Sequence, residues 1–150
     1  NIAYGKPDAT PNEVIHAARC IGALRAIAAI PGGFLAPVGE DGRGLSSGQR
    51  QLIALARAEL VKPQLMLLDE ATSTLDPATE KTILSASTRL MSNRTSVIVA
   101  HRLATAAQAD RILVMDGGRI VETGNHDELL AREGIYADLW KHSVSGGSDI

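Results

Sequence analysis

The stretch from Leu45 to Glu70 reads LSSGQRQLIALARAELVKPQLMLLDE and decides the fold. A small Ser/Gly turn opens a helical run, and a bare apolar strand then ends in two acids. A helix N-terminus suits a phosphate, and an acid pair at a strand end suits Mg²⁺ and a water molecule. The sequence contains no Gly-x-x-x-x-Gly-Lys-Ser/Thr segment, the loop that normally cradles nucleotide phosphates.

Composition indicates an ordinary globular chain. Its 150 residues are enough for one domain with a core, and 45% are hydrophobic and 21% charged. The net charge of -2 gives no electrostatic footprint for nucleic acid, so we expect no nucleic-acid partner. The single cysteine, Cys20, excludes an internal disulfide framework and fits a reducing setting, and we expect it to be a small core residue.

Two capping boxes predict two helices in the first half of the chain. Thr10 to Glu13 supplies an N-cap, a proline at the first helical position and an acid at the third, and the apolar spacing extends this helix to about Ala29. Ser46 and Gln49 form the second box, and the helix that they begin runs to about Val61.

Two continuous apolar runs, Leu65–Leu68 and Ser96–Ala100, predict strands that are buried on both faces. Asp76 and Pro77 open a helix between these strands, which ends near residues 92–93. A strand, a helix and a strand in this order predict a right-handed parallel crossover.

The last third of the chain predicts a hairpin and two short helices. Residues 111–115 and 119–122 flank Gly117 and Gly118, and residues 126–132 and 135–142 have helical spacing. Open α/β sheets usually contain more strands than these, so we expect the chain to be the C-terminal part of a larger α/β domain.

The candidate catalytic groups follow the two apolar strands. Asp69 at a strand end is suited to hold Mg²⁺, and Glu70 beside it to orient or deprotonate an attacking water. His101 follows the second strand, and the crossover predicts that it lies at the same sheet edge as Glu70. The simpler alternatives are a pair of solvated acids and a histidine that caps a loop.

The other polar candidates have equally simple alternatives. Ser46, Ser47 and Gly48 form an anion site at a helix start or an ordinary N-cap, and Asp76 before Pro77 is a good cap. We expect the remaining histidines to be solvated on helical surfaces: His16, His126 and His142. No His/Cys/Asp cluster has zinc spacing.

Together these motifs resemble the ATP-binding cassette (ABC) ATPases. Leu45–Gln49 is similar to the signature motif, and Leu65–Asp69 looks like the Walker B strand with Glu70 in the place of the catalytic glutamate. Ser73–Asp76 resembles the D-loop, and His101 matches the switch histidine.

Further segments resemble exporter-type members of this family, so the resemblance covers nearly the whole chain. They are Asn1–Gly5, which looks like the segment after the Q-loop; Val38–Gly42, which resembles the loop that faces the transmembrane domains; and Arg119–Leu130, which resembles the C-terminal region.

The resemblance implies an α/β fold, a partial P-loop NTPase (RecA-like) parallel sheet with an ABC helical subdomain inserted N-terminally. Within residues 1–150, about 1–62 would form the helical subdomain that carries the signature motif. About 63–142 would form part of the catalytic core, and 143–150 a flexible tail.

The resemblance also implies a function. The chain would be part of the ATP-binding and ATP-hydrolysing domain of an exporter, with ATP and Mg²⁺ as cofactors, at the cytoplasmic face of a membrane. Its partners would be a second nucleotide-binding domain, in a head-to-tail dimer, and transmembrane domains that contact the Val38–Asp41 loop. The implied site residues are catalytic Glu70 and His101, the metal ligand Asp69, and the ATP-binding residues Ser46, Ser47, Gly48, Gln49 and Asp76. In such a dimer Ser46 and Glu70 would serve opposite ATP molecules.

Two positions depart from the family pattern. Ser47 stands where the family usually has Gly, and a side chain there would alter the turn or crowd the γ-phosphate. Asp41 stands where exporters often carry Arg. Without a phosphate loop, we expect the 150-residue chain alone to hydrolyse ATP negligibly.

Two other functions stay open from the sequence. The chain would also fit the C-terminal ATPase lobe of a genome-maintenance protein of the structural-maintenance-of-chromosomes type. It would also fit a non-catalytic interaction module that completes a partner's site. Its exposed sheet edges would invite pairing with another chain.

Overall fold

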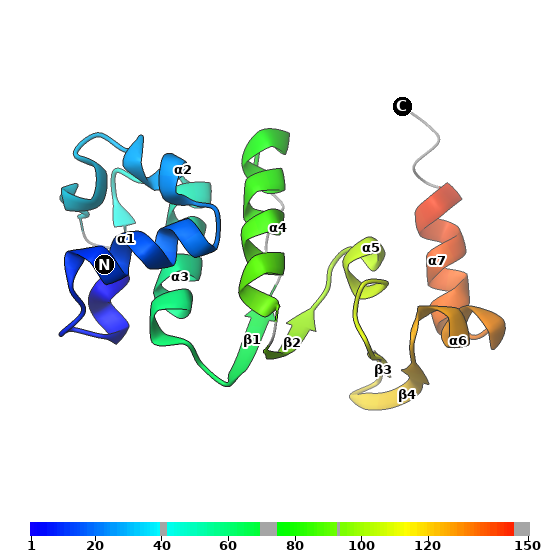
Figure 1. Cartoon of the computed structure of the whole chain (residues 1–150). Helices are drawn as coiled ribbons and strands as arrows, with labels where there is room; N and C mark the ends of the chain where they lie inside the picture. Colours follow the sequence, from blue (N-terminus) through cyan, green and yellow to red (C-terminus); the bar gives the residue numbers. More distant parts are fainter. Residues whose placement is uncertain (40–41, 70–74, 93, 146–150) are drawn as a thin grey trace. The chain divides into compact units, whose positions relative to one another are not determined.

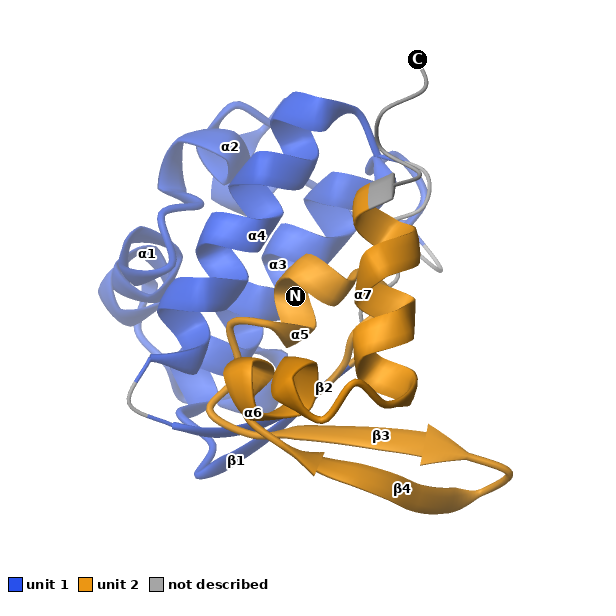
Figure 2. Ribbon diagram, turned by 90° about the vertical axis from the view of Figure 1, so that its right-hand side faces the viewer, with its two compact units in different colours: residues 1–68, 72–97 blue, residues 69–71, 98–150 orange. Residues whose placement is uncertain are grey.

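The computed structural model describes residues 1–39, 42–69, 75–92 and 94–145, and the elements follow one another as in Figure 1. The chain divides into two compact units, which are described separately (Figure 2). Unit 1 contains residues 1–68 and 72–97, and unit 2 contains residues 69–71 and 98–150. The expected division near residue 62 and the flexible tail from 143 stay predictions, and residues 146–150 of that tail lie outside the described part.

Unit 1 is built around one central helix, α3. This helix packs against its neighbours α1 and α4 and against the short 3-10 helix η1. The helical elements of unit 1 are η1 (Ile2–Gly5), α1 (Pro11–Cys20), α2 (Leu24–Ala28), η2 (Gly33–Leu35), α3 (Ser47–Val61) and α4 (Pro77–Met91). Ala18, Ala56 and Ala86 are fully buried, so the helix backbones approach closely in this core.

The prediction of one helix to about Ala29 is wrong, because the chain turns at Gly22 between α1 and α2. Gly22 has φ 77, and a Cβ atom there would lie 2.8 Å from Nη1 of Arg89 on α4. The positive φ explains why the chain turns at this glycine, and the Arg89 side chain occupies the space beside it. The predicted start is confirmed: Thr10 Oγ1 accepts a hydrogen bond from the Glu13 N–H at 3.3 Å, and Glu13 accepts one from the Thr10 N–H at 2.7 Å.

Cys20 is exposed, so the prediction that it belongs to the core is wrong. Ala17, Ala18 and Ile21 occupy the buried face of this part of the chain. Cys20 lies on another face, where its Sγ is 3.4 Å from Nδ1 of the exposed His16. Residues four apart lie on the same side of a helix, which explains this pairing.

Strands β1 (Leu65–Asp69) and β2 (Thr95–Val99) form a two-stranded parallel sheet, with α4 as the crossover between them. The predicted parallel pairing with a crossover helix is confirmed, and its right-handedness stays a prediction. The prediction of burial on both faces is wrong, because Leu67 is 76% and Val99 57% exposed, whereas Met66 is 5% exposed and joins the core of unit 1. Alternate residues of a strand point to opposite faces, and the described helices of unit 1 cover only one of them.

Unit 2 is a hairpin with helices against it. Its elements are α5 (Leu103–Ala106), β3 (Ile112–Asp116), β4 (Arg119–Gly124), α6 (His126–Ala131) and α7 (Ile135–Ser145). The predicted hairpin is confirmed: β3 and β4 are antiparallel, and Gly117 and Gly118 have φ values of 52 and 75. The core of unit 2 consists of Ile112, Val114, Leu129 and Tyr136. The short helix α5 was not predicted.

The side chain of Glu122 on β4 holds the start of α7. Its two carboxylate oxygens accept hydrogen bonds from the N–H groups of Ile135, at 2.7 Å, and Tyr136, at 3.0 Å. The carboxylate also fills the space that a side chain at Gly134 would need. A negative charge at the positive end of a helix is favourable, so Glu122 joins the hairpin to α7 electrostatically as well as by hydrogen bonds.

His126 is not simply solvated, which corrects the prediction for this residue. Its Nδ1 is 2.8 Å from the hydroxyl oxygen of Tyr136, and its ring lies edge-on to Trp140 with the ring centroids 4.5 Å apart. Burial raises the pKa of the Tyr136 hydroxyl. His142 and His16 are exposed as expected.

Candidate functional site

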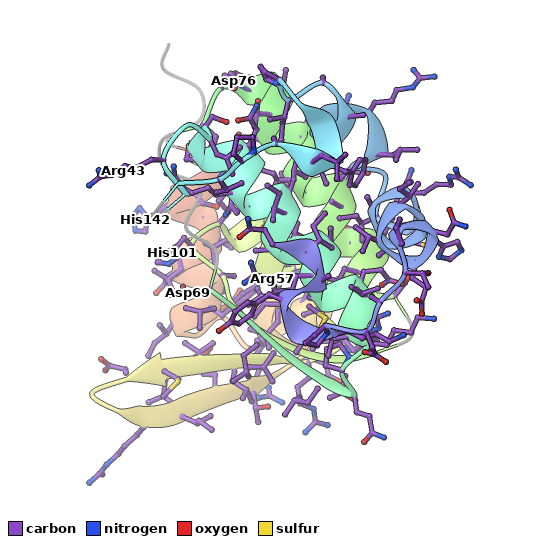
Figure 3. The ribbon with its side chains drawn as sticks, turned by 90° about the vertical axis from the view of Figure 1, so that its left-hand side faces the viewer. Arg43, Arg57, Asp69, Asp76, His101 and His142 are labelled. Atoms are coloured by element: carbon purple, nitrogen blue, oxygen red, sulfur yellow. The ribbon has the colours of Figure 1, made fainter. Side chains whose placement is uncertain are left out.

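The contact that brings sequence-predicted residues together lies at the end of the parallel strands. Asp69 is the last residue of β1, and His101 follows β2 after Ala100. Nε2 of His101 lies 3.4 Å from Oδ1 of Asp69, and Figure 3 shows the two side chains side by side. Both belong to unit 2. Parallel strands end at the same sheet edge, which explains why residues far apart in sequence meet here.

Both side chains of this pair are accessible to a ligand. The side chain of Asp69 is 76% exposed and that of His101 65% exposed. Asp69 therefore has carboxylate oxygen free for a further bond. Glu70 and residues 71–74 lie outside the described residues, so the predicted water-activating role of Glu70 stays a prediction.

The donor chemistry of Asp69 fits Mg²⁺. The described residues contain no group of three or more His, Cys, Asp or Glu side chains placed to hold a metal. Mg²⁺ is typically bound by one or two carboxylates together with water and substrate phosphates, and does not need a complete protein cage. A single exposed carboxylate at a strand end matches that pattern.

The start of α3 in unit 1 is a reciprocal capping box, as predicted. The Gln49 N–H donates to Ser46 Oγ at 3.1 Å, and the Ser46 N–H donates to Gln49 Oε1 at 2.9 Å. These bonds use Ser46 Oγ and Gln49 Oε1 as acceptors, and they leave the Ser46 hydroxyl proton and the Gln49 amide protons available to donate. Ser47 and Gly48 lie in the first turn, whose N–H groups have no acceptor within the helix.

Ser47 fits its place without distortion, which corrects the expectation that a side chain here would alter the turn. It is the first residue of α3, it is exposed, and among the described residues only Lys62 and Glu133 are non-glycine residues with positive φ. The backbone at Ser47 therefore makes no demand for glycine. Crowding of the γ-phosphate by this side chain stays a prediction.

Gly48 has a packing role that the sequence did not reveal. It is buried, and a Cβ atom at this position would overlap with Cγ2 of Thr79 on α4 and lie 3.6 Å from Cδ2 of Leu75. The absence of a side chain therefore lets α3 and α4 approach each other. The contact partner lies on another helix, so no local sequence signal would have found it.

Arg50 stabilises the loop that precedes the Ser46–Gln49 capping box. Its Nη1 donates a hydrogen bond to the carbonyl oxygen of Leu45 at 2.7 Å. Its side chain also lies where Gly42, with φ 75, would carry a Cβ atom. Glu40 and Asp41 of the predicted transmembrane-facing loop lie outside the described residues.

Asp76 serves as the N-cap of α4. Its Oδ1 accepts a hydrogen bond from the Thr79 N–H at 3.0 Å. Hydrogen bonds from the Thr79 side chain and backbone lower the pKa of the Asp76 carboxyl. The capping interpretation is therefore confirmed, and a role in binding ATP stays a prediction.

Comparisons with known proteins agree with these motifs. The family model described as "ABC transporter" matches residues 23–73. The chain is 55% identical over 139 residues to a multidrug efflux ATP-binding/permease protein of Mycobacterium bovis, covering 93% of this chain and 12% of that protein. It is 48% identical to an ATP-dependent lipid A-core flippase of Chromobacterium violaceum, covering 96% of this chain and 24% of the flippase.

A solved structure shows the same relationship. The fold matches a bacterial Atm1-family ABC exporter with ATP bound, with a TM-score of 0.81, 45% sequence identity, and coverage of 94% of this chain and 25% of that one.

The chain thus spans between 12% and 25% of the length of these relatives. No helix in the described part of the chain is both long and apolar enough to cross a membrane. The relatives are exporters, which supports the exporter interpretation and not the genome-maintenance alternative. The chain belongs to the ABC transporter family and corresponds to part of an exporter's nucleotide-binding domain.

Proposed function

We propose that this part of the exporter contributes Asp69, Glu70 and His101 to one ATP molecule and the N-terminus of α3 to a second. The observation that carries the proposal is the 3.4 Å contact between Asp69 and His101 at the ends of adjacent parallel strands. Ligands of open α/β sheets bind at this edge of the sheet.

The acid and histidine would work together on the terminal phosphate. Asp69 would hold Mg²⁺ directly or through water, and the bound metal would neutralise charge on the phosphates. Asp69 also orients the His101 ring, whose exposed side chain is free to contact the terminal phosphate or the attacking water. Glu70, next to Asp69 in sequence, would orient that water and accept its proton.

The start of α3 would bind a phosphate of the other ATP. The capping box fixes the direction of the Ser46 hydroxyl and the Gln49 amide, which retain protons to donate. The N–H groups of Ser47 and Gly48 and the positive end of the helix add to this attraction. Asp76 would lie near the same phosphates through the D-loop.

Because the chain would contribute to two different ATP molecules, each ATP site would need a partner. A second nucleotide-binding domain, in a head-to-tail dimer, would supply the missing half of each site. Transmembrane domains would contact the Val38–Asp41 loop, and the assembly would lie at the cytoplasmic face of a membrane. ATP hydrolysis would then drive or reset transport.

A chimeric exporter tests the catalytic assignment. Residues 1–139 would replace the equivalent segment of a purified bacterial exporter of this family, and Mg-ATP turnover would be measured. Glu70→Gln should lower turnover by about a hundredfold or more, since general-base catalysis typically contributes that much. Asp110→Asn, a change of an exposed acid in unit 2, is the matched control. Unchanged turnover in Glu70→Gln would contradict the assignment and favour a non-catalytic module.

The 150-residue chain by itself should not turn over ATP measurably. It contains no Gly-rich Lys-Ser/Thr loop to hold the phosphates in line with an attacking water. A sensitive phosphate-release assay on the purified chain checks this expectation. Turnover that disappears in the Glu70→Gln variant of the same chain would refute it.

A further inference from the structure

The peptide group between Leu45 and Ser46, at the entrance to α3, is held at both of its polar ends by side chains of that helix. The carbonyl oxygen of Leu45 accepts a hydrogen bond from Nη1 of Arg50 at 2.7 Å. The N–H of Ser46 belongs to the same peptide group and donates to Oε1 of Gln49 at 2.9 Å. Two adjacent residues of α3 therefore hold one peptide group from its two sides.

This double contact sets the direction of the groups that we propose to meet a phosphate. A peptide group is planar, so holding the Leu45 carbonyl also sets the direction of the Ser46 N–H. That N–H occupies the oxygen of the Gln49 side-chain amide, which leaves the two amide protons for another acceptor. Ser46 Oγ accepts from the Gln49 N–H at 3.1 Å and is fixed by the same arrangement.

The Arg50 side chain is itself positioned by the loop that precedes the capping box. Gly42 has φ 75, and a Cβ atom there would lie 2.7 Å from Cδ and 3.2 Å from Cγ of Arg50. The Gly42 carbonyl oxygen accepts a hydrogen bond from the Leu45 N–H at 3.1 Å, so the loop is closed beside the arginine stem. A stem that is already restricted loses less conformational freedom when its guanidinium bonds to Leu45.

The geometry points to Arg50 as a positioning residue for the phosphate-binding start of α3. This inference rests on the function proposed above and adds a residue to it, because Arg50 acts on Ser46 and Gln49 through the peptide group that it holds. Without the guanidinium, that peptide group is held at one end alone. The turn then meets a phosphate in several orientations, and ordering it costs part of the free energy of binding.

Mixed dimers of the chimeric exporter test this role, because in the proposed dimer each ATP site joins Glu70 of one protomer to the α3 start of the other. In two mixtures one protomer carries Glu70→Gln, which leaves one working site. Arg50→Met keeps the apolar stem beside Gly42 and removes the donor. It is placed on the Glu70→Gln protomer in the first mixture and on the partner protomer in the second.

The working site uses the α3 start of the Glu70→Gln protomer, so the two mixtures should differ. In the first mixture the apparent KM for ATP should rise by about tenfold, the effect of weakening one charge-assisted hydrogen bond to a phosphate. The kcat should change less, because the turn binds the phosphate before and during the reaction alike. In the second mixture the KM should equal that of a dimer with Glu70→Gln alone.

Two controls separate positioning from stability and from net charge. A general loss of stability acts equally on the two mixtures, since both contain the same substitutions. Arg43→Met removes the same charge from an exposed arginine in the preceding loop and should leave the KM unchanged when it replaces Arg50→Met in the first mixture. Amide exchange in the 150-residue chain, measured by NMR, tests the contact without ATP. Arg50→Met should speed exchange at the Ser46 N–H, and exchange at the fully buried Leu129 should stay as it is.

The outcomes distinguish this role from the function on which it rests. Equal KM values in the two mixtures, or an unchanged exchange rate at the Ser46 N–H, would overturn the role of Arg50 alone. Turnover that persists when both protomers carry Glu70→Gln would overturn the proposed function, and the role of Arg50 with it.

Discussion

Replacing Gly48 by Ala tests most sharply how the first turn of α3, which begins at the Ser46–Gln49 capping box, packs against α4. Gly48 lies in the first turn of α3, and its missing side chain leaves room for α4. A Cβ atom there would overlap with Cγ2 of Thr79 and would also touch Leu75 and Ile83, at 3.6 and 3.7 Å. The structure thus predicts that a glycine in a helix, normally a weak point, is needed here for packing.

Two opposing contributions set the size of the effect. Gly→Ala in a helix is favourable by about 1 kcal/mol. Overpacking a tight contact costs about 1 to 3 kcal/mol. Thr79 is branched at Cβ and lies in the first turn of α4, so its methyl group has few alternative positions. We therefore expect Gly48→Ala to lower the free energy of unfolding by about 1 kcal/mol, the difference between overpacking and propensity.

Urea unfolding of the purified chain, followed by circular dichroism, measures this change. Thr79→Ser removes the methyl group but keeps the hydroxyl that bonds to Asp76, so it serves as the second arm of a double-mutant cycle. The double variant should recover the loss and gain the helix propensity of Ala. The coupling between the two sites should then equal the overpacking cost, about 1 to 3 kcal/mol.

Either of two results would refute this reasoning. At an exposed helix glycine the same change would raise the free energy of unfolding. A measured increase for Gly48→Ala would therefore show that α3 and α4 are not in close contact. A coupling near zero would show that Thr79 is not the obstructing residue.

Two further changes probe the rest of the fold. Glu122→Ala should lower the free energy of unfolding by about 1 to 2 kcal/mol, because an exposed N–H group at Ile135 and a half-buried one at Tyr136 lose their acceptor; Glu122→Gln keeps an acceptor oxygen and should cost less, and equal losses in both would argue against the capping bonds. Hydrogen bonds from Lys6 and from Thr10 lower the pKa of Glu13 to about 2 from its ordinary 4.5. The folded carboxyl is the stronger acid, so its stabilisation is present above about pH 4.5 and lost as the pH falls toward 2. Glu13→Gln should therefore flatten the fall in the thermal midpoint over this range, and an unchanged slope would exclude Glu13 as its source.

Local signals account for what the sequence predicts well. The capping boxes at Thr10 and Ser46 and the glycine pair in the hairpin each lie within four residues, so their chemistry is complete in the sequence. The contact of Asp69 with His101 is also predictable, because parallel strands end at one sheet edge.

Contacts between distant elements account for what the sequence does not predict. The turn at Gly22 is filled by Arg89, the packing of Gly48 depends on Thr79, and the start of α7 is held by Glu122. A small thiol is often buried, which predicts a core position for Cys20, yet this residue lies on the exposed face of α1 that carries His16. Each of these features depends on how separate elements pack together, and the local sequence of one element does not encode that packing.

The measurement that tests the central claim most directly uses mixed dimers of the chimeric exporter. In one mixture a protomer carries both Ser46→Arg and Glu70→Gln and its partner is unmodified; in the other the two changes are divided between the protomers. If the start of α3 and Glu70 serve opposite ATP molecules, the divided dimer keeps one intact site and hydrolyses Mg-ATP, whereas the first dimer has none. The opposite outcome, activity in the first dimer and none in the divided one, would contradict the account.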